Sequence, residues 1–74
     1  IVARKIELLD VVALLDDIPR ARLQRGQVGT VVEPLAPDVY EVEFSDDEGQ
    51  TYASLSIPAS NLLPLVYQPI ESST

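Results

Sequence analysis

Carboxylates are the side chains best placed for chemistry in this sequence. Glu41 and Glu43 alternate with apolar residues, and Asp46, Asp47 and Glu48 follow closely. Carboxylates gathered in this way could attract a basic partner, hold a cation, or act as an acid and base pair. The same series is also typical of a solvated strand face that ends in a hairpin turn.

Catalysis and metal binding find little support around these carboxylates. A calcium site needs oxygen ligands at alternating positions of a longer loop, and residues 46–49 lack that spacing. Acid and base catalysis needs a pocket that shifts a pKa, and a core this small leaves little room for one. The chain has no Cys and no His, so no His can activate Ser54, Ser56 or Ser60. We predict no catalytic residue, no metal and no cofactor, and therefore a protein that is not an enzyme.

Charge is distributed unevenly along the chain. All five basic residues lie in the first 25 positions, whereas the rest carries eight of the twelve acidic residues and no base. The net charge of −7 repels phosphate backbones and attracts basic surfaces. We therefore expect a protein partner with a basic surface and no nucleic-acid ligand, although acidity could equally serve only to keep a small protein in solution.

A hairpin must carry the acidic series. Residues 40–44 show the clearest alternation in the chain, which predicts a half-buried strand with glutamates on its outer face. Residues 46–49 read as the hairpin turn, where Gly49 is free to adopt a positive φ. The return strand is predicted over residues 50–57, with Tyr52 and two serines on its polar side.

Two more strands are predicted before this hairpin. Residues 8–15 are mostly apolar, and their short length and adjacent β-branched residues favour a strand over a helix. A second strand is expected at residues 28–33, after an exposed loop that ends in a turn bracketed by Gly26 and Gly29. Residues 34–38 are bounded by prolines and read as a loop.

The end of the domain completes the expected fold. Residues 58–61 combine Pro, Ser and Asn, which predicts a 3-10 turn, and residues 62–66 can supply a closing strand. Five short strands joined by Gly and Pro turns predict an all-β fold, a small five-strand SH3-like barrel with a 3-10 turn before the last strand. We place this domain at residues 7–67, between a leader at residues 1–6 and a flexible tail at residues 68–74.

Neither a membrane span nor a secretion signal is evident. The longest apolar runs fall far short of the roughly 20 residues that a transmembrane helix needs. No signal-peptide pattern opens the chain. We therefore expect a soluble cytoplasmic protein with no membrane partner, whose oligomeric state the sequence leaves open.

Several sequence blocks together resemble a known family. They are LLDVVALL at residues 8–15, RGQVGTVVE at residues 25–33, YEVEF at residues 40–44 and GQTYA at residues 49–53. Over about residues 7–66 the chain resembles the small bacterial proteins known as domain of unknown function 4926. The resemblance implies an SH3-like barrel and no established activity. It also implies a gene beside that of another small protein, an arrangement similar to toxin and antitoxin pairs.

A second, shorter likeness points to RNA. Residues 26–33 look like the glycine-centred turn of KOW modules, which occur in ribosomal proteins and transcription factors. RNA-binding KOW modules are usually basic, and only Arg20, Arg22 and Arg25 are available here for phosphate contacts. These arginines could instead bind an acidic partner or pair with Asp16 and Asp17 across the first loop.

The leading hypothesis is a small acidic protein-binding module, the antitoxin-like or immunity-like partner of a neighbouring gene product. Its predicted partner-binding residues, named the acidic hairpin below, are Glu41, Glu43, Asp46, Asp47 and Glu48. The alternatives are a KOW-like accessory domain that binds RNA or the ribosome, and a structural subunit that adds its edge strand to a larger assembly. Tyr52 and Tyr67 could form part of an aromatic peptide groove, but we expect them to pack or to be partly exposed.

Overall fold

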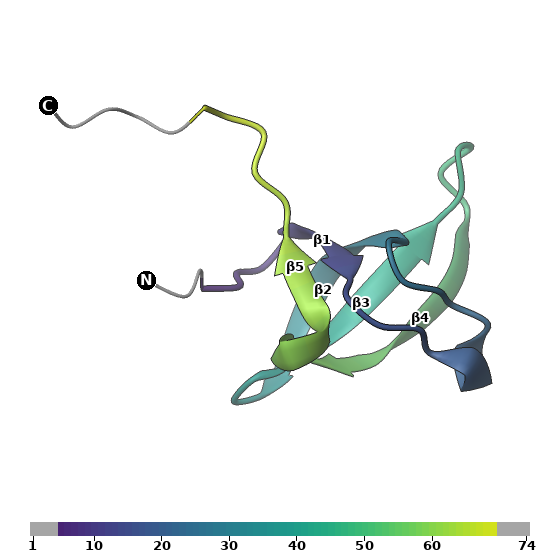
Figure 1. Ribbon diagram of the computed structural model, residues 1–74, viewed down its shortest axis with the longest axis horizontal. Helices are drawn as coiled ribbons and strands as arrows, with labels where there is room; N and C mark the ends of the chain where they lie inside the picture. The colour runs from purple at the N-terminus through teal and green to yellow at the C-terminus, as the bar shows by residue number, and fades with distance from the viewer. Residues whose placement is uncertain (1–4, 70–74) are drawn as a thin grey trace, which may run out of the picture.

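The computed structural model describes residues 5–69, so most of the predicted leader and most of the predicted tail lie outside the described residues. Its strands and 3-10 turns are β1 (Val11–Leu14), η1 (Pro19–Ala21), β2 (Val28–Ala36), β3 (Val39–Ser45), β4 (Thr51–Pro58), η2 (Ala59–Asn61) and β5 (Leu62–Pro64) (Figure 1). Within residues 5–69 there is no helix long and apolar enough to cross a membrane.

All five strands belong to one antiparallel sheet, in the order β4-β3-β2-β1-β5. The predicted all-β domain of five strands with a 3-10 turn before the last strand is confirmed. The sheet is not closed into a barrel, however, because β4 and β5 form its two edges and do not pair with each other. β5 has only three residues and ends at Pro64, which has no backbone N–H to extend a ladder.

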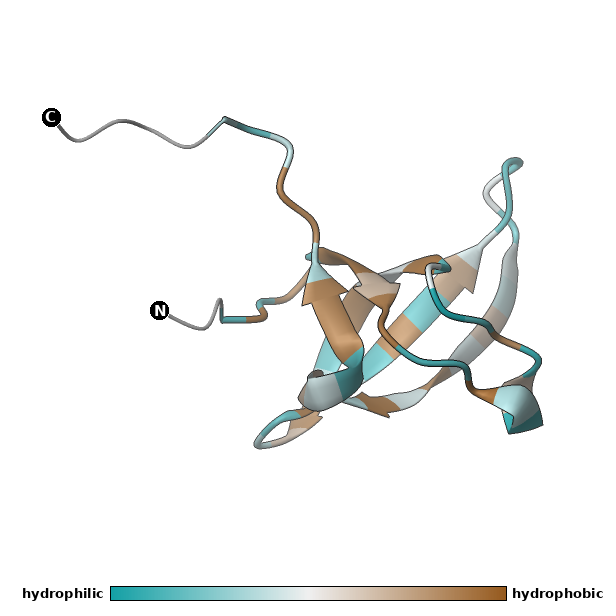
Figure 2. Cartoon of the chain, in the orientation of Figure 1, coloured by the Kyte–Doolittle hydropathy of each residue, from teal (hydrophilic) through white to brown (hydrophobic). Residues whose placement is uncertain are grey.

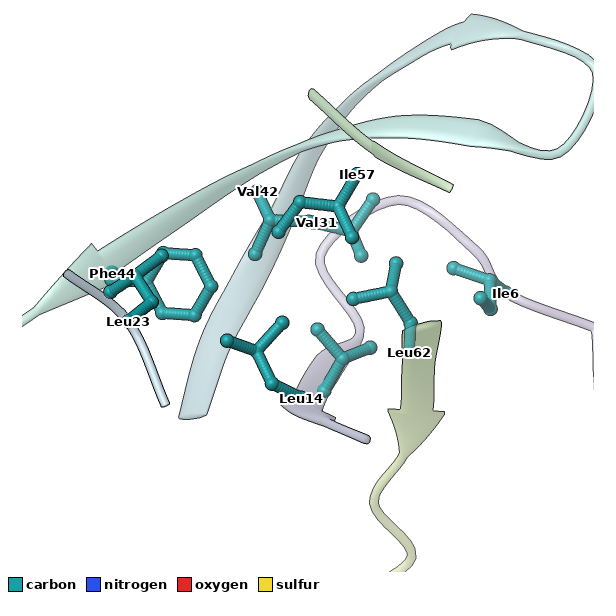
Figure 3. Close-up of a cluster of buried hydrophobic side chains, with 9 residues drawn as sticks. Ile6, Leu14, Leu23, Val31, Val42, Phe44, Ile57 and Leu62 are labelled. Carbon is teal, nitrogen blue, oxygen red and sulfur yellow. The ribbon is translucent and has the colours of Figure 1, made fainter. Parts of the chain in front are cut away.

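Apolar residues recur along the strands (Figure 2), and one face of the curled sheet encloses the hydrophobic core, whose side chains Figure 3 shows. The buried residues are Ile6, Val12, Leu14, Leu23, Val31, Val42, Phe44, Ile57 and Leu62. Every strand contributes to this set, and in β1 and β3 the buried residues alternate as the period of a strand requires. Ile6, the last residue of the predicted leader, and Leu23 from the first loop complete the core.

The second strand is longer than predicted. β2 continues to Ala36 through the stretch expected to be a loop, and only Pro37 and Asp38 remain as a turn before β3. Pro34 fits because the pairing with β3 shifts register on both sides of it, before Glu33 and again before Ala36. Such bulges interrupt the ladder and therefore tolerate a residue that cannot donate a hydrogen bond.

The two glycines predicted to bracket a turn have separate roles. Gly26 adopts a positive φ of 92° and donates its backbone N–H to Leu14 O at 2.8 Å. Gly29 instead lies buried inside β2, where it pairs with Val12. The prediction of one turn spanning both glycines was therefore wrong, because β2 already begins at Val28.

β1 is shorter than the predicted strand over residues 8–15. A turn precedes it, in which Asp10 accepts the backbone N–H of Glu7 at 2.8 Å through Oδ2. The chain leaves β1 at Leu15 and Asp16, whose N–H groups donate to Asn61 Oδ1 at 3.1 and 2.7 Å. The side chain of Asn61 thus ties η2 to the end of β1, and both ends of β1 are fixed by side-chain oxygens.

Candidate protein-binding face

β3 presents its acidic residues as the alternation predicted. Val42 and Phe44 are fully buried, and Glu41 and Glu43 are half-buried on the opposite side of the strand. We call this side, which faces away from the core, the outer face of the sheet. The outer face of β3 is therefore the part of the acidic hairpin that a regular backbone holds in place.

Glu33 joins these residues from the neighbouring strand. The bulged register of β2 sets Glu33 directly opposite Glu41, and residues opposite each other in a sheet share a face. Sequence reasoning missed Glu33 because its partner on β3 is set by the bulge between Pro34 and Ala36, which no local pattern reveals. We refer to Glu33, Glu41 and Glu43 together as the outer glutamates.

The outer glutamates lie in a region without any basic residue. Residues 28–58, which span β2, β3 and β4, contain no Lys or Arg. Like charges directly opposite each other in a sheet are destabilising, by up to about 1 kcal/mol. The pair of Glu33 and Glu41 therefore has an unfavourable electrostatic energy that a cation could relieve.

Glu41 reaches towards the edge of the sheet. Its Oε2 accepts a hydrogen bond from Ser54 Oγ at 2.8 Å, although Ser56 is the residue directly opposite it on β4. This diagonal contact carries the carboxylate over β4. Because Ser54 and Ser56 are small and exposed, the carboxylate stays open to solvent from the side of the edge strand.

Asp46 has a structural role in the hairpin turn. Its Oδ1 accepts the backbone N–H groups of Glu48 and Gln50, both at 2.9 Å, and its carbonyl accepts the N–H of Gly49 at 3.0 Å. Gly49 adopts the positive φ predicted for it, at 82°. Asp46 therefore shapes the turn, whereas Asp47 and Glu48 are exposed at its tip.

Tyr52 departs from the predicted alternation. A register shift at the start of β4 frees it from regular pairing, and its ring lies 6.4 Å from the ring of buried Phe44. Its hydroxyl accepts a hydrogen bond from Gln27 Nε2 at 3.0 Å. Tyr67 follows β5, at the other edge of the sheet, and is 76% exposed. Phe44 and Tyr52 form the aromatic contact of the described residues, and an aromatic groove built from Tyr52 and Tyr67 is not formed.

The arginines of the first loop are separate from the acidic strands. Arg20, Arg22 and Arg25 are all exposed, on η1 and the residues that follow it. Asp17 contacts this loop through the backbone, since its Oδ1 accepts the N–H of Arg25 at 2.8 Å. A shallow polar hollow of about 480 Å³ opens here beside Arg22.

A larger hollow of about 710 Å³ lies at the end of the sheet, between the residues before β1, the turn into β3, and η2. Its lining is mainly apolar and includes Ile6, Tyr40 and Leu62, with Lys5 and Asp38 as the charged residues. Among residues 5–69 there is no cluster of three or more potential ligands that could hold a metal ion. Neither hollow gathers residues of the acidic hairpin.

A family model described as "Domain of unknown function (DUF4926)" matches residues 8–64, which include all five strands. No curated protein and no solved structure matches the chain. The description of this family names no activity, so we infer what the chain binds from the geometry and charge of its acidic strands.

Proposed function

The chain belongs to the family described as a domain of unknown function (DUF4926), and we propose from its structure that it is a small protein-binding module. Its outer glutamates receive a basic surface of a partner protein. In the finer form of this proposal, the partner is the product of an adjacent gene in a bacterial cytoplasm, as in antitoxin and immunity pairs.

One observation carries the proposal: Glu33 and Glu41 stand opposite each other with no base on the three strands around them. A sheet designed only for stability would gain from a neutral or basic residue at either position. A binding face would instead gain from unpaired negative charge, which accelerates the approach of a basic partner and selects against acidic ones. The uneven charge along the chain supports the same proposal, because it keeps the arginines off these strands.

Co-expression with the adjacent gene product tests this function. We expect a complex whose association slows when salt is raised, because salt screens charges that attract over more than about 10 Å. Glu41→Lys with Glu43→Lys should weaken the complex at least about tenfold. A complex that this double substitution leaves unchanged would contradict the proposal, as would the absence of any complex.

A matched control separates the face from the overall charge. Glu7 and Asp16 are exposed acids that lie outside β2, β3 and β4. Glu7→Lys with Asp16→Lys changes the net charge by the same amount and should weaken the complex far less. Equal losses in the two double variants would assign binding to net charge and would count against a defined face.

RNA binding has weaker support in the structure. In the part of the chain that the structure describes, the exposed arginines are Arg20, Arg22 and Arg25 of the first loop, whereas β2 and β3 carry the outer glutamates, which repel phosphate. A gel-shift assay at low salt tests this alternative. RNA binding that is lost in Arg22→Ala with Arg25→Ala would replace the protein-binding proposal.

A further inference from the structure

β4 is an unpaired edge of the sheet along its whole length. It has eight residues and pairs with β3 alone. Among the described residues, no backbone hydrogen bond joins residues 51–58 to a second strand or to a loop. One row of its N–H and C=O groups is therefore free to pair with another chain.

The two edges of the sheet differ in how well they are protected. Proteins usually block an edge by keeping it short, by adding Pro, or by placing charged residues on it. β5 is short and ends at Pro64, so it has such protection. β4 has no charged residue, and its single proline is Pro58, at its last position. Residues 53–57 thus form an open stretch of edge.

Side chains on the outer face favour one kind of occupant for this edge. Strands in a sheet lie about 4.8 Å apart, so a strand added to β4 would be separated from β3 by β4 alone. On that route lie Ser54 and Ser56, which are small and exposed. Long basic side chains can extend over small residues while their charged ends reach a carboxylate. Glu41 already leans towards this route through its bond to Ser54.

We propose that β4 binds an extended segment of the partner as an added strand, with Lys or Arg at alternate positions directed across β4 towards Glu41 and Glu43. This inference rests on the proposed function and specifies its binding mode. Backbone pairing along residues 53–57 would supply the affinity, and the alternation of basic side chains would supply the specificity. A second copy of this chain fits less well as the added strand. Its β4 has no basic side chain to reach Glu41 and Glu43, and the copy as a whole would add negative charge.

A model peptide of alternating lysine and threonine provides the probe. NMR can follow the exchange of backbone amide hydrogens in the whole chain, with and without this peptide. We expect exchange to slow at least about tenfold at alternate residues within 53–57, because every second amide of an edge strand points outward. A peptide of the same composition with its lysines in one block should protect these amides less, since its charges are out of phase with the sheet.

Backbone methylation of the probe tests the pairing directly. In an added strand, only every second N–H of the peptide faces β4. Methylation of the nitrogens that face β4 should therefore abolish protection, whereas methylation of the nitrogens at the intervening residues should not. Glu41→Gln with Glu43→Gln should weaken binding of the unmodified peptide several-fold. The matched control Glu7→Gln with Asp16→Asn should leave it nearly unchanged.

The outcomes separate this binding mode from the proposed function. Peptide binding that shifts resonances of β3 but protects no amide of β4, or that tolerates methylation of either set, would overturn strand addition. The protein-binding function would then stand on the co-expression experiment alone. If the adjacent gene product also binds the variant with Glu41→Lys and Glu43→Lys as tightly as the wild type, the proposed function fails as well.

Discussion

At position 29 the sheet leaves no space for a side chain. A Cβ placed on Gly29 would lie 2.8 Å from Val42 Cγ1 and 2.9 Å from both Glu43 O and Phe44 Cδ2. Two of these atoms belong to buried core side chains and the third to the backbone of β3, so none of them can move away freely. Glycine is required here for close packing of β2 on β3, and not for an unusual φ.

Gly29→Ala should therefore destabilise the fold by about 1–3 kcal/mol, the usual cost of overpacking a core. In a domain of this size that loss lowers Tm by roughly 4–8 °C per kcal/mol, which thermal unfolding followed by circular dichroism can measure. Val28→Ala, at an exposed position of the same strand, is the control and should change Tm much less. Equal effects at the two positions would show that the sheet can relax around residue 29.

Asp46 is a second single residue on which local structure depends, since one of its side-chain oxygens accepts two backbone N–H groups. Asp46→Ala should cost about 1 kcal/mol, as the loss of other local side-chain caps does. Asp46→Asn keeps the accepting oxygen and should be nearly neutral in urea unfolding. Asp47→Ala, in the same turn, should also be nearly neutral, because Asp47 is exposed at the tip. If Asp46→Ala and Asp47→Ala are equally stable, the turn does not depend on this oxygen.

Among the elements, the pairing of β2 with β3 matters most for the proposed function. The turn at Pro37 and Asp38 begins the pairing, and the bulge between Ala36 and Pro34 then shifts it so that Glu33 lies opposite Glu41. Bulges often redirect a side chain next to a functional site. Here they place a negative charge beside another one, so this part of the hairpin combines lower stability with a stronger local field.

Glu33→Gln should separate these two effects. Removing one of the opposed charges should stabilise the fold by about 0.2–1 kcal/mol, because like charges across a sheet repel each other. The same change should slow association with a basic partner, since the face loses part of its attraction. Urea unfolding and stopped-flow association measure the two effects, with Glu7→Gln as the control for net charge. A less stable Glu33→Gln variant would contradict the proposed repulsion.

Strand faces could be predicted from the sequence, whereas register and edges could not. The alternation of residues 40–44 predicted that Val42 and Phe44 are buried and that Glu41 and Glu43 face outward, because burial on one side of a strand leaves a period of two. The bulges of β2 and β4 depend on how neighbouring strands pack. For that reason the position of Glu33 opposite Glu41 and the contact of Tyr52 with Phe44 were not predictable. That β4 remains an edge also depends on β5 pairing elsewhere.

Over the whole molecule, charge and apolar surface are segregated. The core lies on one face of a single curled sheet (Figure 1), and the outer glutamates lie on the opposite face, Glu33 on β2 and Glu41 and Glu43 on β3. Within residues 5–69, the exposed arginines lie on the first loop. A protein of this charge gains attraction for basic partners, while repulsion between its own carboxylates reduces the stability of the compact state.

Salt should therefore have opposite effects on the fold and on its complex. Raising NaCl from about 0.01 M to about 0.15 M shortens the screening length from about 30 Å to about 8 Å. Repulsion among the carboxylates then weakens, so Tm of the free protein should rise by a few degrees. The same screening should weaken the complex with a basic partner, because its charges attract one another.

A variant with Glu33→Gln, Glu41→Gln and Glu43→Gln tests whether the outer glutamates cause both responses. Its Tm should depend less on salt than that of the wild type, and its association rate should lose most of its salt dependence. Calorimetry of the free protein and stopped-flow mixing with the partner give the two slopes. The variant could instead keep the wild-type salt dependence of Tm while its association rate loses its salt dependence. In that case the self-repulsion arises elsewhere on the acidic surface, and the outer glutamates act in binding alone.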